Sequence, residues 1–148
     1  MNLKERITED MKAAMRARDG ARLGAIRFLQ AAIKQKEVDE RVQADDAAVL
    51  AIIEKLIKQR KDSIQQFQQA ARSDLVEKER AELALLQSYL PQQMSDSELE
   101  KAVVAAIAAS GASGAQAMGK VMALLRPQLA GRADMGKASA LVKQRLAG

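Results

Sequence analysis

Neither cysteine nor histidine occurs anywhere in this chain of 148 residues. Without cysteine the chain has no thiol nucleophile, no thiolate ligand for a metal and no disulfide bond. Without histidine it also lacks the usual imidazole base of enzymes and the commonest nitrogen ligand of zinc. Catalysis would have to depend on Asp, Glu, Lys, Ser, Thr or Tyr side chains, which removes most of the common hydrolase designs.

Aromatic residues are scarce as well, and the apolar runs are short. Phe28, Phe67 and Tyr89 are the only aromatic residues, whereas Ala, Leu, Gln, Lys and Glu are abundant, a composition that favours helix over sheet. No run approaches the roughly 18 consecutive apolar residues of a membrane span. Residues 1–15 are amphipathic and lack the apolar segment of a signal peptide. From these absences we expect a cytoplasmic protein without a membrane partner.

Apolar residues recur at helical spacing along most of the chain, and no segment has the pattern of a strand. Four helices are expected before Pro91, which ends the fourth. Three more are expected after it, the first of them starting at a Ser95-to-Glu98 capping box and the last capped by Asp134. Pro127 is expected to bend or end the sixth helix. The predicted fold is all-α, with an N-terminal helical bundle of about four helices in residues 1–93 and a small three-helix domain in residues 94–148.

Positive charge is concentrated in residues 118–146, which hold six Lys or Arg residues and one acidic residue, Asp134, and therefore a net charge of +5. Concentrated positive charge is typical of proteins that bind polyanions, most often nucleic acid. No aromatic residue lies among the basic ones, so contact with the phosphate backbone is favoured over base stacking. The alternative is that these charges only solvate helix faces. The predicted nucleic-acid-binding residues are Lys120, Arg126, Arg132, Lys137, Lys143 and Arg145.

The spacing G-x-x-x-x-G-K occurs twice, in residues 114–120 and 131–137. A nucleotide-binding P-loop also needs a preceding strand and a Ser or Thr after the Lys, whereas this chain has Val or Ala there. These glycines are expected to permit tight turns, and the helix amides beside each Lys would form at most a weak anion site. We therefore predict no cofactor, no metal site and no catalytic residue.

A second basic run lies in the middle of the predicted third helix. Its members are Lys55, Lys58, Arg60 and Lys61. Charge runs on long helices usually face solvent without a partner, and a solvated face is expected here too.

Five stretches of the chain resemble the GatB/YqeY family: LKERITEDMKAAMRARD, RLGAIRFLQAAIKQKEVDER, EKLIKQRKDSIQQFQQAARSDLVEKERAEL, LQSYLPQQMSDSELE and MGKVMALLRPQLAGRADMGKASALVKQRL. The resemblance covers nearly the whole chain. Its most specific parts are the boundary around Pro91 and the MGKVM and GRAD blocks.

The resemblance implies a C-terminal domain similar to the tail of the B subunit of the tRNA-dependent amidotransferase. That enzyme converts misacylated Glu-tRNA(Gln) or Asp-tRNA(Asn) to the correct amide, and its tail is understood to contact tRNA rather than to perform chemistry. Residues 118–122 and 131–134 match the shared tail motif, in which Lys120 and Arg132 are the side chains able to reach phosphate. The expected function is that of a tRNA-binding accessory protein, non-catalytic alone.

Two alternatives remain open at this point. The resemblance also implies carbon–nitrogen ligase activity with glutamine as the amide donor, either alone or with partner subunits. The long third helix would instead suit a helical adaptor that docks another protein. The expected partners are tRNA, aminoacyl-tRNA or an amidotransferase-related protein.

Overall fold

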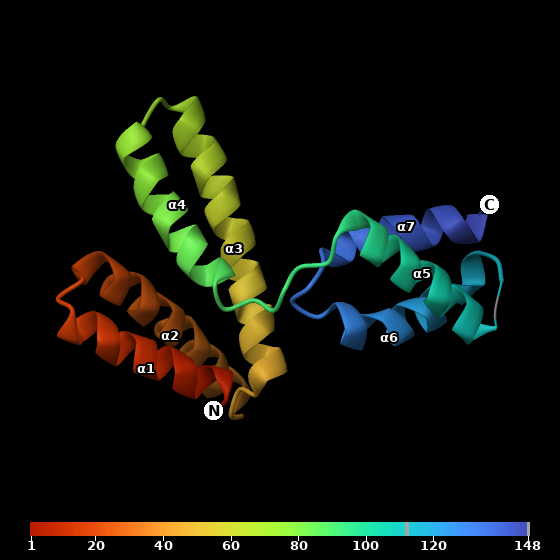
Figure 1. Ribbon diagram of the computed structural model, residues 1–148, viewed down its shortest axis with the longest axis horizontal. Coiled ribbons are helices and arrows are strands. Elements are labelled where there is room, and N and C mark those ends of the chain that lie inside the picture. Colours follow the sequence, from red (N-terminus) through yellow and green to blue (C-terminus); the bar gives the residue numbers. More distant parts are fainter. Residues whose placement is uncertain (112, 148) are drawn as a thin grey trace. The chain divides into compact units, whose positions relative to one another are not determined.

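The computed structural model describes residues 1–111 and 113–147, and in these ranges the regular structure is entirely helical (Figure 1). This confirms the predicted all-α class. A single 3-10 turn, Ala115–Ala117, leads into the sixth helix. The α-helices of the described residues are α1 (Leu3–Arg16), α2 (Gly20–Glu40), α3 (Asp46–Gln69), α4 (Ser73–Gln87), α5 (Asp96–Ser110), α6 (Met118–Leu129) and α7 (Met135–Ala147).

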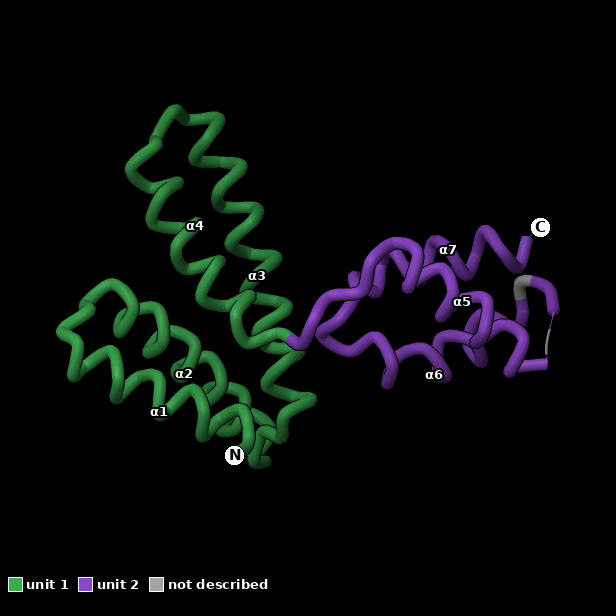
Figure 2. The backbone as a smooth tube through the Cα atoms, viewed as in Figure 1, with its two compact units in different colours: residues 1–90 green, residues 91–148 purple. Residues whose placement is uncertain are grey.

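Contacts between Cα atoms divide the chain into two compact units, Met1–Leu90 and Pro91–Gly148 (Figure 2). The first unit holds α1–α4 and the second holds α5–α7, which is the predicted grouping of four helices and three. Hydrogen bonds tie the residues just after Pro91 to the loop between α6 and α7. The Met94 amide donates to the Arg132 carbonyl at 2.8 Å, and the Gln93 side chain donates to the Gly131 carbonyl at 2.6 Å.

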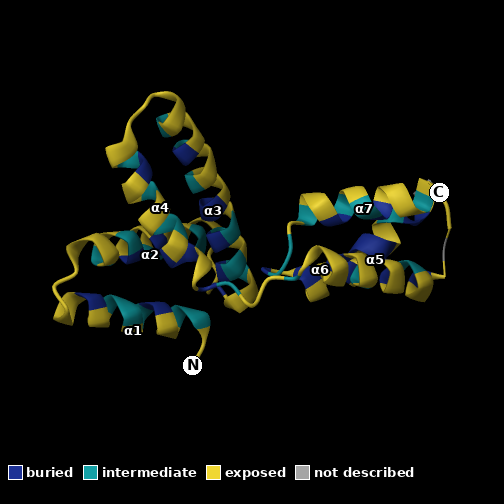
Figure 3. Ribbon diagram, turned by 45° about the horizontal axis from the view of Figure 1, so that its top comes forward, coloured by how far each residue is buried: buried dark blue, intermediate teal, exposed yellow. Residues whose placement is uncertain are grey.

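The first unit consists of two helical hairpins, α1–α2 and α3–α4, around one apolar core. Leu3, Ile7 and Met11 recur every four residues along α1 and are buried in this core or pack against it, whereas Met15 is 49 % exposed near the end of the helix. Figure 3 shows the buried positions as dark blue patches along the helices. The side chains buried most completely are Ile7, Ile26, Leu29, Val49 and Ile53.

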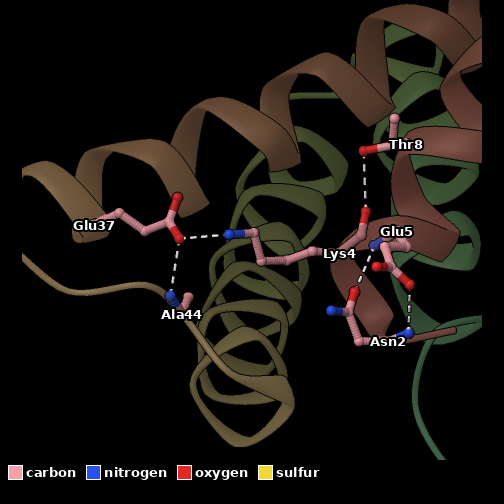
Figure 4. Close-up of polar contacts among 6 residues, drawn as sticks. All are labelled: Asn2, Lys4, Glu5, Thr8, Glu37 and Ala44. Atoms are coloured by element: carbon pink, nitrogen blue, oxygen red, sulfur yellow. Dashed lines mark hydrogen bonds and ion pairs between the residues drawn. The ribbon is translucent and has the colours of Figure 1, made fainter.

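Glu37 joins three parts of the first unit (Figure 4). Its carboxylate accepts a hydrogen bond from the Lys4 ammonium of α1 at 2.5 Å and another from the Ala44 amide at 2.8 Å, in the loop that follows α2. These donors hold the pKa of Glu37 below its ordinary value, the Lys4 bond contributing most. Beside this contact, Asn2 and Glu5 form a reciprocal capping box that starts α1.

Arg60 contradicts the expectation that the basic run of α3 is a solvated face. Lys55, Lys58 and Lys61 are exposed, but the Arg60 side chain is only 18 % exposed. Its guanidinium forms ion pairs with Glu79 at 3.3 Å and Glu82 at 3.1 Å on α4, and its Cζ atom lies 4.6 Å from the ring centroid of Phe28 on α2. One arginine therefore connects three helices, and its partners are too distant in sequence for a local pattern to reveal them.

The second unit packs α5, α6 and α7 around a separate core. The predicted capping box is present, since Ser95 accepts from the Glu98 amide and Glu98 accepts from the Ser95 amide. Pro127 does not end α6, which continues to Leu129. The chain then turns at Gly131, whose φ of +72° lies in the left-handed region that glycine adopts without strain. The fully buried side chains of this core are Val103, Val121, Leu125, Leu129, Ala138 and Val142.

Candidate nucleic-acid interface

The two G-x-x-x-x-G-K stretches share a glycine and a helix start, although a 3-10 turn leads into α6 and a non-helical turn leads into α7. In each, a glycine with positive φ (Gly114 at +82° and Gly131 at +72°) stands four residues before a helix that opens with Met-Gly-Lys. In the described ranges neither stretch follows a strand, so neither has the surroundings of a nucleotide-binding P-loop. The repeated pattern instead places Lys120 and Lys137 at the third residue of α6 and α7, where both side chains are exposed.

Three of the six predicted basic residues are exposed and have no ion-pair partner among the described residues. They are Lys120 and Arg126 on α6 and Lys143 on α7. The core of the second unit holds Val121, Leu125 and Val142 of the same helices, so these three cations lie on helices whose inward positions are apolar. Their charge is available to an external anion.

The other three basic residues make contacts within the second unit. Arg132 donates through Nε to the Gln92 carbonyl at 3.2 Å, so an alanine at this position would disturb the loop as well as the charge. Lys137 forms an ion pair with Asp96, and Arg145 forms one with Glu100. Asp96 begins α5 and Glu100 follows one turn later on the same helix.

The acidic residues of α5 make the net charge of the second unit lower than that of residues 118–146 alone. Residues 91–148 contain seven Lys or Arg residues, including Lys101, against four acidic residues, Asp96, Glu98, Glu100 and Asp134, a net charge of +3. The segment 118–146 alone has +5, because α5 lies outside it. The second unit still has a net positive charge, but fewer of its cations lack an acidic partner than the sequence predicted.

Other kinds of site have less support in the described residues. There, no group of three or more Asp or Glu side chains is placed to hold a metal ion. None of the helices in 1–111 and 113–147 is long and apolar enough to cross a membrane. The exposed cations of α6 and α7 are therefore the strongest candidate site.

A family model described as Yqey-like protein matches residues 4–146 of this chain. The chain belongs to the YqeY-like family. Its similarity to curated proteins covers different shares of their length. Relatives named "Altered inheritance of mitochondria protein 41, mitochondrial" include the protein of Pyrenophora tritici-repentis, 35% identical over 130 residues that cover 86% of this chain and 71% of the relative.

Two further relatives have the same name. The Lachancea thermotolerans protein is 43% identical over 95 residues, which cover 64% of this chain and 51% of the relative. The Saccharomyces cerevisiae (strain YJM789) protein is 41% identical over 92 residues, which cover 62% of this chain and 50% of the relative. This chain thus spans about half the length of these two relatives.

The names of these relatives contradict the predicted cytoplasmic location, because they describe the relatives as mitochondrial. The prediction was wrong for a physical reason. It rested on the lack of an apolar signal segment, whereas segments that direct proteins to mitochondria are amphipathic and rich in Arg. The lack of an apolar segment therefore cannot distinguish a cytoplasmic protein from a mitochondrial one.

Proposed function

We propose that this YqeY-like protein is a tRNA-binding accessory protein that holds RNA phosphates on its second unit. The observation behind the proposal is the set of exposed cations on α6 and α7 that have no ion-pair partner among the described residues, namely Lys120, Arg126 and Lys143. The choice of tRNA comes from the resemblance of residues 118–122 and 131–134 to the tail of the amidotransferase B subunit.

The chemistry of the second unit suits backbone contacts better than base contacts. All three aromatic residues of the chain precede residue 91, so this unit has none on which a base could stack. Lys and Arg side chains bind phosphate without regard to sequence, and each contact releases condensed counterions. Affinity should therefore fall steeply as salt is raised.

The test is binding of the full chain to bulk tRNA over a salt series. The variant K120A/R126A/K143A removes three phosphate contacts and should lower the slope of log K against log salt by about 2 to 3, at about 0.7 to 0.9 per contact. The control K55A/K58A/K61A removes three exposed lysines from α3 in the first unit. It should keep the wild-type slope.

Two results would count against the proposal. Wild-type protein that does not bind tRNA at low salt has no such function. Equal loss in the two triple variants would mean that net charge, rather than the surface of α6 and α7, determines binding.

A further inference from the structure

Two ion pairs join α5 to α7 on the surface of the second unit. Asp96 pairs with Lys137 near the starts of the two helices, and Glu100, one turn further along α5, pairs with Arg145 near the end of α7. The two acids and the two bases cancel in charge. In contrast, Lys120, Arg126 and Lys143 have no such acid beside them in the described part of the chain.

All four side chains of these pairs are in contact with water. The exposed fractions are 52 % for Lys137 and 85 % for Asp96, and 45 % for Arg145 and 52 % for Glu100. Exposed ion pairs are weak, so the strength of these pairs alone does not keep a phosphate from replacing either carboxylate. The displaced carboxylate, however, would remain on α5 beside the incoming phosphate and repel it, because like charges at short range oppose each other.

We propose that Asp96 and Glu100 are internal competitors of RNA phosphate that remove Lys137 and Arg145 from the RNA-binding surface. This inference rests on the proposed function, since it concerns which cations of the same unit contact RNA. It separates a binding set, Lys120, Arg126 and Lys143, from a neutralised pair, Lys137 and Arg145, whose side chains contact α5. RNA is also repelled from α5, so Asp96 and Glu100 determine which face of the second unit binds RNA.

The first test removes the two acids from the full chain. In D96N/E100Q the cations Lys137 and Arg145 become available, and two further phosphate contacts should steepen the slope of log K against log salt by about 1.4 to 1.8. Affinity for tRNA at 0.1 M salt should rise by about tenfold or more, since each contact contributes close to one power of salt concentration. The control D62N/E77Q adds the same two charges on exposed positions of the first unit and should leave the slope unchanged.

The second test removes both pairs together. The variant D96N/E100Q/K137Q/R145Q keeps the net charge of the wild type, so it isolates the role of Lys137 and Arg145. If the acids already neutralise these cations, this variant should bind tRNA with the wild-type slope and within about twofold of the wild-type affinity.

Asp96 lies in the first turn of α5, where a carboxylate favours the helix dipole. The single variant E100Q leaves that residue in place and should give about half of the change in slope. E100Q therefore replaces the double variant as the test if D96N disturbs α5. Circular dichroism would detect such a disturbance as a loss of helix content.

Three outcomes separate this inference from the proposed function. Wild-type protein that fails to bind tRNA overturns both. Wild-type binding with an unchanged slope in D96N/E100Q and in E100Q overturns only the role of the acids. A quadruple variant whose slope falls by about 1.4 to 1.8 would show that Lys137 and Arg145 contact phosphate in the wild type, and it also overturns only that role.

Discussion

The contact between Arg60 and two glutamates offers a direct test of how the first unit is held together. In the variant R60M, a flexible apolar side chain takes the place of the guanidinium, and Glu79 and Glu82 are left side by side without their cation. The side chains of the three residues are 14–19 % exposed, so the surviving carboxylates would be poorly solvated. The substitution also removes the cation from above the Phe28 ring.

The magnitude follows from the burial and the alignment of these groups. Removing one partner of a fully buried ion pair costs about 3 to 5 kcal/mol, and an exposed pair contributes about 0 to 1 kcal/mol. The Arg60 Nε and Glu79 Oε2 atoms are buried without a well-aligned hydrogen bond, which points to the lower part of the buried range. Including about 0.5 kcal/mol for the half-exposed Phe28 ring, we expect R60M to lose about 3 kcal/mol of unfolding free energy in total.

The assay can observe the first unit alone. Tyr89 is the only tyrosine and the chain has no tryptophan, so tyrosine emission reports on residues 1–90. This side chain is buried, and its hydroxyl donates to Asp10 at 2.7 Å, so unfolding should change its emission. Urea titration followed at Tyr89 would give the difference between R60M and wild type, and a loss of about 3 kcal/mol corresponds to at least about 12 °C in Tm for a unit of this size.

Two further variants complete the test. K61M removes an exposed charge from the next position of α3 and should change stability by less than about 0.5 kcal/mol. R60M/E79Q/E82Q should recover more than half of the loss, because the two uncompensated charges are gone. If R60M unfolds within about 0.5 kcal/mol of wild type, or if the glutamines recover nothing, the reasoning about Arg60 is refuted.

Two other predictions concern the pKa of Glu37 and the backbone conformation of Gly131. Because the pKa of Glu37 is lowered on folding, its carboxylate stabilises the protein above its ordinary pKa of 4.5 and ceases to do so as pH falls through the lowered value. E37Q should therefore be less stable than wild type in urea at pH 7, by a difference that shrinks as the pH is lowered below 4.5, and a difference that is constant with pH would contradict this. G131A should lose about 1 kcal/mol of unfolding free energy, because φ at this position is +72°, where an alanine is strained. The control G20A lies in a helix and has no atoms within 4 Å of the added Cβ, so it should be as stable as wild type or slightly more stable. Equal thermal unfolding of the two variants would argue against a strained turn at Gly131.

Local signals in the sequence were sufficient for most of the fold. The Ser95-to-Glu98 capping box, the apolar spacing of each helix and the stop before Pro91 depend on residues within a few turns of one another. A local expectation that the structure meets only in part concerns one position. Pro127, expected to bend or end the sixth helix, lies in the last turn of α6 without ending it.

The candidate site was predictable only in part, because its charges are arranged by tertiary contacts. Lys137 and Arg145 are 41 and 45 residues away from the acids that neutralise them, and no local pattern links the members of such a pair. The same limit applies to Arg60 and its partners on α4. A count of Lys and Arg along the chain identifies a basic segment, but the fold decides which of those side chains remain unpaired.

The helices of both units pack mainly against their neighbours in the sequence. The α1–α2 and α3–α4 hairpins of the first unit, and α5 with α6 and α6 with α7 in the second, provide most of the contacts between elements. Ordering such contacts closes only short loops, so the entropic barrier to folding is low and folding within microseconds to milliseconds is expected. Each hairpin can form as soon as its own residues are available, so a chain that emerges gradually need not wait for its last helix to protect its apolar side chains from aggregation.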